Sequence, residues 1–144
     1  MKNPFRLSIL FVLLLSACQS SSRSNIEVVF TRDHCEYNGP NGEVESPITV
    51  HVVNKTNAED NFNLGASDDY ALVIATLKDG FTKADLEAYQ GYGAPESVDN
   101  FVEVITFAGE ERTEEFELEA GQEHFIICAR QSGFISVPAV ITPK

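Results

Sequence analysis

Hydrophobic and polar residues alternate along most of this chain with the two-residue period of a β-strand. Ile26, Val28 and Phe30, for example, occupy alternate positions, as in a strand with one buried face. Strand-like patterns occur in seven segments: residues 25–34, 47–53, 70–77, 101–107, 111–119, 124–129 and 138–141. Residues 36–42 (EYNGPNG) contain two glycines and a proline and are predicted to form a turn.

Two segments depart from simple alternation. Residues 70–77 (YALVIATL) are almost continuously apolar, which fits a strand buried on both faces or a short buried helix. The β-branched residues and the eight-residue length favour the strand. Thr82 and Asp85 are spaced as in a capping box, so a short helix is predicted from there to about Tyr89. Glycines and a proline between residues 91 and 95 end it.

About seven closely spaced strands and one short helix predict an all-β sandwich. The chain has 144 residues, which suits a single domain. We assign the sandwich to residues 26–144, because no linker or internal repeat interrupts that stretch.

The first seventeen residues have the pattern of a secretion signal. Lys2 and Arg6 precede a nine-residue apolar run, residues 7–15, and the small residues Ser16 and Ala17 follow. A membrane-spanning helix needs about twenty apolar residues, so this run is too short to be one. A short apolar run behind positive charges is typical of a signal peptide, here residues 1–17.

Residues 15–18 (LSAC) resemble the lipobox of bacterial lipoproteins at every position. The resemblance implies diacylglycerol on the Cys18 sulfur, cleavage before Cys18 and acylation of the new amine with a fatty acid such as palmitate. Two or three acyl chains anchor a protein stably in a membrane. An ordinary secretion signal with a chance cysteine is the alternative. Residues 18–25 are polar and serine-rich, which predicts a flexible tether. Gln19, where an Asp would favour the inner membrane, favours the outer membrane of a Gram-negative cell.

The chain is strongly acidic, with 22 acidic and 10 basic side chains and a formal charge of −12. Removing residues 1–17 removes two basic and no acidic residues, so 8 minus 22 gives −14 for the mature chain. Such a surface repels nucleic acid and anionic lipid headgroups. We therefore expect no nucleic-acid partner and membrane attachment through the Cys18 anchor alone. The charge favours solubility or, alternatively, docking of a basic partner or of cations.

Cys35 and Cys128 are the cysteines that remain after maturation. Exported proteins meet an oxidising environment, so a disulfide between these two is the simplest prediction. It would close a loop of 93 positions, for which the chain-entropy model gives about 4–5 kcal/mol of stabilisation. A metal-binding or redox pair is the alternative, although no C-x-x-C motif is present.

The second half of the sequence resembles the cupredoxin-like domains. Their last hairpin has the pattern pGxYxxxC, and residues 120–128 (AGQEHFIIC) are similar to it. Residues 35–40, 48–54 and 77–86 also look like uncharacterised bacterial cupredoxin-like lipoproteins. The resemblance extends loosely over residues 26–142 and implies a Greek-key β-sandwich.

The copper ligands of that family do not follow from the resemblance. A type 1 copper site uses two imidazoles, a thiolate and usually a weak axial methionine. The family's cysteine falls at Cys128, but no histidine follows His124, and Met1 is the single methionine. A disulfide would also occupy the Cys128 sulfur. We therefore expect a cupredoxin-like scaffold without copper, and fold alone does not fix function.

Other candidate sites are sparse. His34 and His124 flank the two cysteines, so a disulfide could bring both to a zinc or copper site with a carboxylate; otherwise they are surface histidines, as is His51. Loose calcium binding in an aspartate-containing loop, residues 54–69, is a further alternative, at Asp60, Asp68 and Asp69. Motifs of hydrolases, nucleotide-binding proteins and metalloproteases do not occur in the sequence.

The sequence thus predicts a lipid-anchored, extracytoplasmic, non-enzymatic binding or structural module of the cell envelope, without a cofactor and with an unknown envelope protein as its partner. We expect the contact surface in one of two long loops, residues 54–69 or 91–100, because binding residues favour loops on rigid scaffolds. Two alternatives are a periplasmic protein that handles copper or zinc and an inhibitor of a basic secreted hydrolase such as a lysozyme.

Overall fold

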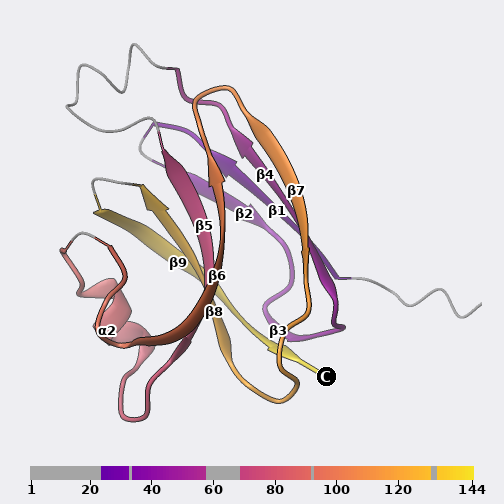
Figure 1. Ribbon diagram of the computed structural model, residues 1–144, viewed down its shortest axis with the longest axis vertical. Coiled ribbons are helices and arrows are strands. Elements are labelled where there is room, and N and C mark those ends of the chain that lie inside the picture. Colours follow the sequence, from indigo (N-terminus) through magenta and orange to yellow (C-terminus); the bar gives the residue numbers. More distant parts are fainter. Residues whose placement is uncertain (1–23, 33, 58–68, 92, 131–132) are drawn as a thin grey trace, which may run out of the picture.

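A computed structural model describes residues 24–32, 34–57, 69–91, 93–130 and 133–144 (Figure 1). These residues form nine strands and one short helix, α2 (Lys83–Glu87), which lies between β5 and β6. The four-stranded sheet has the order β2-β1-β4-β7 and consists of β1 (Ser24–Phe30), β2 (Cys35–Asn38), β4 (Ile48–Asn54) and β7 (Glu111–Phe116). The five-stranded sheet has the order β3-β9-β8-β5-β6 and consists of β3 (Gly42–Val44), β9 (Gly133–Pro143), β8 (His124–Arg130), β5 (Tyr70–Leu77) and β6 (Val98–Thr106).

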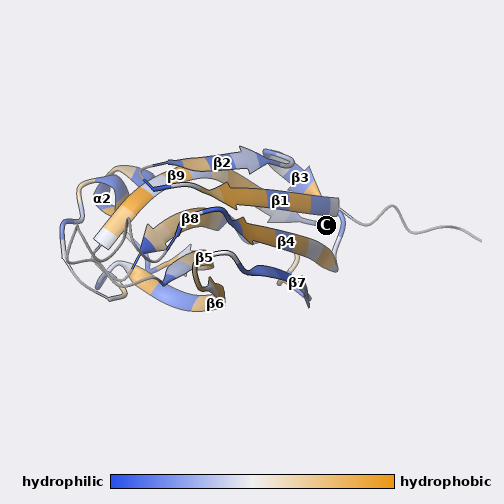
Figure 2. Cartoon of the chain, turned by 90° about the horizontal axis from the view of Figure 1, so that it is seen from above, coloured by the Kyte–Doolittle hydropathy of each residue, from blue (hydrophilic) through white to orange (hydrophobic). Residues whose placement is uncertain are grey.

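The two sheets pack around one main hydrophobic core, so the predicted β-sandwich is confirmed (Figure 2). Alternation along the strands produces this core. In β4, Ile48, Val50 and Val52 are fully buried, whereas the residues between them are partly exposed. Phe30 and Tyr70 face each other across the core, with ring centroids 5.2 Å apart.

Both sheets are mixed. β1 pairs in parallel with β4, and β3 in parallel with β9, whereas the other pairs are antiparallel. Pro138 had suggested an edge strand. β9 lies between β3 and β8, but β3 pairs only with residues 141–143, so Pro138 lies on a stretch of β9 that, within the described residues, pairs with β8 alone. From Ser136 to Ala139 β9 advances by three positions while β8 advances by two. The proline therefore lies in a β-bulge, where no ladder hydrogen bond is needed from it.

The nine strands exceed the seven predicted because β2 lies mostly in the predicted turn, residues 36–42, and β3 begins at the last residue of that turn. These strands are only four and three residues long, and their own pattern is too short to indicate a strand. Pairing with β1 and β9 defines them instead. The Tyr37 hydroxyl donates a hydrogen bond to the Pro40 carbonyl, and burial raises the pKa of Tyr37 to about 12.

The element ends also differ in detail from the prediction. β1 begins at Ser24, so the last two residues assigned to the tether belong to the sheet. The helix ends at Glu87, slightly before Tyr89. Its predicted capping box is present: the Asp85 carboxylate accepts hydrogen bonds of 2.7 Å from both the backbone N–H and the hydroxyl of Thr82. These bonds, the hydroxyl's first, lower the pKa of Asp85. Within the described residues, no helix has the length and apolar character needed to cross a membrane.

Candidate functional site

The outer face of the five-stranded sheet carries many apolar side chains. Outward-facing residues are apolar on β5 (Ala71, Val73) and on β8 (Ile127, Ala129), while the alternate residues of the same strands fill the main core. The nearly continuous apolar sequence of residues 70–77 had predicted a strand with two apolar faces, and the structure shows that strand. An apolar outer face needs something to cover it.

Helix α2 covers one end of this face (Figure 1). Leu86 is fully buried there, in a second cluster that includes Phe125 and Val137. The helix has only five residues, so it shields only part of the sheet. The uncovered remainder is an apolar groove that we take as the candidate functional site.

The segment that follows α2 forms one wall of the groove, through Tyr89, Gly91, Gly93, Ala94 and Pro95. A β-carbon at Gly91 would overlap the Tyr89 ring, so only glycine lets the chain pass so close to that ring. Gly93 has φ of +77°, in the left-handed region that favours glycine. The two glycines therefore shape the wall, and the sequence pattern had identified them only as helix-terminating residues.

The groove has a volume of about 280 Å³. That is slightly less than the roughly 300–1,000 Å³ typical of pockets that enclose a whole small ligand. Its lining is mostly apolar, and the charged residues along it are Asp69, Glu103 and Arg130. The space suits an apolar side chain or a small apolar group, with charged partners at its margin.

Large apolar side chains are exposed beside the groove. On β6, Phe101 is 49% exposed and Ile105 is 37% exposed, and both line the groove. Phe107, in the turn after β6, is also exposed. Neighbouring exposed apolar side chains at the mouth of a groove are typical of a binding surface.

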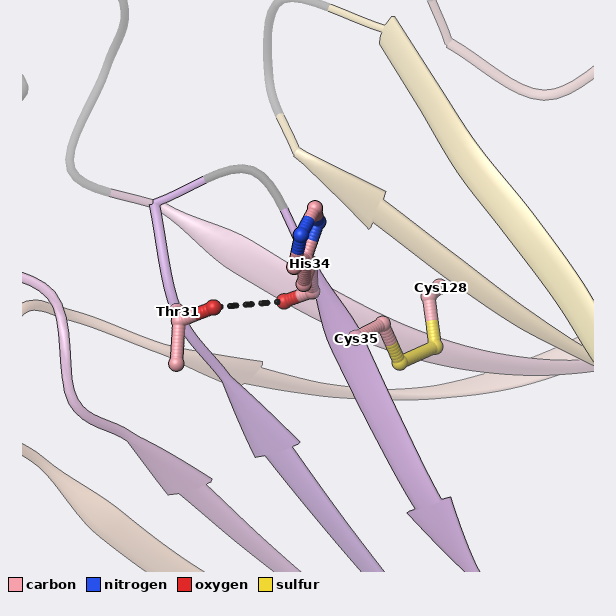
Figure 3. Close-up of a disulfide and its surroundings, with 4 residues drawn as sticks. All are labelled: Thr31, His34, Cys35 and Cys128. Carbon is pink, nitrogen blue, oxygen red and sulfur yellow. Dashed lines mark hydrogen bonds between the residues drawn. A yellow bond between two sulfur atoms is a disulfide. The ribbon is translucent and has the colours of Figure 1, made fainter.

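The predicted disulfide between Cys35 and Cys128 is present and joins β2 of one sheet to β8 of the other (Figure 3). The two Cα atoms are 6.3 Å apart. His34 is exposed beside Cys35, and its carbonyl accepts a hydrogen bond from the Thr31 hydroxyl. Its ring points away from the two sulfur atoms in Figure 3.

The histidines lie apart. His124 is buried at the start of β8, four residues and roughly 13 Å along the strand from Cys128, and its Nδ1 lies 2.9 Å from the Gln122 carbonyl oxygen. His51 lies on the outer face of the other sheet, where Nδ1 is 2.9 Å from the Thr113 hydroxyl. Among the residues that the structure describes, no group of three or more histidine, cysteine or acidic side chains could hold a metal ion. A metal site in which the disulfide brings His34 and His124 together was an alternative left open by the sequence, and the structure does not show this arrangement.

Of the two segments predicted to bind, residues 91–100 border the groove, which is lined by Gly91, Gly93, Ala94, Pro95 and Val98. Most of the other loop, with Asp60 and Asp68, lies outside the described residues, as do Cys18 and the predicted signal peptide. Asp69 lies at the edge of the groove. The sequence predicted Phe101 and Ile105 only as strand residues. Alternation alone does not show which face of a strand is exposed, so their place in the groove could not be inferred.

The fold and the groove together define an all-β, two-sheet sandwich with a mostly apolar groove on one outer face. No protein-family model matches the sequence, and no curated protein matches it. Among solved structures, the chain is similar to Na-dithionite reduced auracyanin from the photosynthetic bacterium Roseiflexus castenholzii, at 14% sequence identity and a TM-score of 0.43. The match covers 83% of this chain and 96% of the auracyanin chain.

Proposed function

We propose that this chain is a lipid-anchored envelope protein whose sandwich binds a partially apolar ligand in the groove, without catalysis. The observation that carries the proposal is the apolar outer face of the five-stranded sheet, which α2 covers only at one end. Leaving Phe101 and Ile105 exposed there costs solvation free energy, at about 25 cal/mol per Å² of apolar surface, that a bound ligand would recover.

The placement of the groove fits a tethered protein. Six positions separate Cys18 from Ser24, a span of at most about 20 Å. β1 begins at one end of the sandwich, while α2 and the wall that follows it lie at the other (Figures 1 and 2). Acyl chains on Cys18 would hold the first end near the bilayer, so the groove would stay open to the surrounding compartment.

Two measurements test the proposal. Metabolic labelling with palmitate should mark the wild-type protein and leave Cys18→Ala unlabelled; label retained on the variant would overturn the anchor. For the groove, the uncharged dye Nile red should fluoresce on binding to the purified domain. Ala71→Phe, which places a ring in the groove, should reduce dye binding at least fivefold, whereas Val29→Phe, on the outer face of the other sheet, should not. Equal binding by all three proteins would overturn the groove as the site.

A further inference from the structure

Two sheets have four edge strands, and in the described part of the chain three of them are protected against pairing with another polypeptide. β2 and β3 are only four and three residues long. β3 also leaves residues 133–140 of β9 unpaired on one side, but Pro138 lacks the N–H that an added strand would need there. β7 has six residues, and four of them are charged (Glu111, Arg112, Glu114 and Glu115). Short or charged edges are the usual means by which proteins prevent edge-to-edge association.

β6 is neither short nor mostly charged, since Asp99 and Glu103 are its two charged residues. It is nine residues long and pairs, within the described residues, with β5 alone. Phe101 and Ile105 project from its outer face and remain exposed. The C-terminal end of β6 is not free to pair, because the Thr106 carbonyl accepts a hydrogen bond of 3.1 Å from the Asn54 side chain of the other sheet. The open edge therefore runs over the residues before Thr106, beside the groove.

From this geometry we propose, building on the groove function above, that β6 binds a basic, extended polypeptide segment as an added strand. Main-chain hydrogen bonds to the open edge would supply the affinity. Side chains on the outer face of the added strand would pack beside Phe101 and Ile105, which would extend the apolar floor of the groove by one strand.

Charge selects the kind of segment. β6 and β7 form the same side of the sandwich, as Figure 2 shows, and together they carry five acidic residues and one basic residue. On β6, Glu103 is exposed between Phe101 and Ile105 on the outer face. A lysine or arginine opposite Glu103, flanked by apolar residues two positions away on either side, matches this pattern.

A second copy of this chain fits the edge poorly. An antiparallel β6–β6 pair that places Phe101 opposite Ile105 also places Glu103 opposite Glu103, because 103 is the midpoint of that register. Like charges directly opposite each other are destabilising. Each chain also carries a formal charge of −12, which adds repulsion between copies.

The test uses a synthetic nine-residue peptide with blocked ends, Lys-Thr-Val-Thr-Lys-Thr-Val-Thr-Lys. Its sequence reads the same in both directions, so it can place lysine opposite Glu103 and valines opposite Phe101 and Ile105 in either strand orientation. A matched peptide has glutamate in place of every lysine. Binding is measured by NMR titration of the purified domain, together with amide hydrogen exchange.

The lysine peptide should bind, and alternate amides of β6 should become protected from exchange, because only alternate residues face the open edge. Glu103→Lys should weaken binding of the lysine peptide about tenfold and strengthen binding of the glutamate peptide. Glu36→Lys, the same charge change at an exposed glutamate on edge strand β2, should alter neither affinity by more than about twofold.

Other outcomes separate this inference from the groove function. Peptide binding without new amide protection in β6, or equal losses in Glu103→Lys and Glu36→Lys, would overturn strand addition. If Nile red binds in the groove but no peptide binds β6, the groove function stands and the strand-addition proposal is wrong. Equal binding of both peptides to the wild-type protein would overturn the requirement for a basic segment.

Discussion

Cys35 and Cys128 join the two sheets of the sandwich through a disulfide that encloses 93 positions of the chain. Cys35 lies on the edge strand β2, which has only four residues and, in the part of the chain that the structure describes, pairs with β1 alone. Cys128 lies on β8 and is completely buried in the main core. The covalent bond therefore holds a weakly paired edge strand to a central strand of the opposite sheet.

Removing this disulfide should destabilise the domain strongly. For a loop of this length the chain-entropy model gives about 4–5 kcal/mol, which is a large part of the total stability of a typical domain. We expect the Cys35→Ala/Cys128→Ala variant to unfold at a much lower urea concentration than the wild type. Reduction of the wild-type protein with dithiothreitol should shift its unfolding midpoint similarly. An unchanged midpoint in both experiments would contradict the prediction.

Tyr37 should make stability depend on alkaline pH. Burial raises its pKa from 10.0 to about 12 in the folded protein, so folding favours the neutral phenol. The resulting stabilisation is complete below pH 10 and is lost as the pH rises from about 10 to about 12. In an absorbance titration at 295 nm, Tyr37→Phe should lack the highest ionisation step. The same step in both proteins would show that another tyrosine is responsible.

Asp85 should make the stability of the domain depend on acidic pH. Its pKa is lowered in the folded protein by the hydrogen bonds from Thr82, so the ionised carboxylate is favoured by folding. This contribution is present above the ordinary pKa of 3.8 and is lost as the pH falls through the lower folded value. Relative to Asp85→Asn, the wild type should therefore lose its stability advantage on acidification. A difference in urea midpoint that is constant from pH 7 to about pH 2 would contradict this.

Thr82→Ala offers a related control, because it removes the hydroxyl that donates to Asp85 but retains the backbone donor. We expect this variant to keep part of the acid dependence. A complete loss would assign the whole effect to the hydroxyl.

The strands with a regular period and the helix cap were predictable because each depends on nearby residues. The capping box needs only Thr82 and Asp85, three positions apart. The short strand β3 was not predictable, because its pairing partners are residues 141–143, about a hundred positions away. The disulfide was inferred from the number of cysteines and the predicted export, whereas its position between the sheets required the fold.

Part of the groove was predictable from nearby residues, and part depends on contacts between distant segments. The apolar sequence of β5 indicates two buried faces, but it does not show that α2 is too short to cover the outer one. Nor does the alternation in β6 show that Phe101 points to solvent rather than to the core. The first fact depends on how α2 packs on the sheet, and the second on the place of β6 at the sheet edge. The loop of residues 91–100 was chosen by its length and turn residues, and it does form part of the groove.

Gly91 provides a way to change the groove without changing the sheets. Because a β-carbon at this position would overlap the Tyr89 ring, Gly91→Ala should displace that ring. Tyr89 lines the groove, so the variant should change Nile red affinity by several-fold. Its urea midpoint should stay close to that of the wild type, since neither residue belongs to the buried clusters.

Two variants complete this comparison. Tyr89→Ala should alter dye binding in the Gly91→Ala background much less than in the wild type, because the ring has already left its place. Ala84→Gly, at an exposed position on α2, serves as a control for general loosening of this region and should leave dye affinity unchanged. Additive effects of Gly91→Ala and Tyr89→Ala would show that Gly91 acts on the groove by another route than the Tyr89 ring.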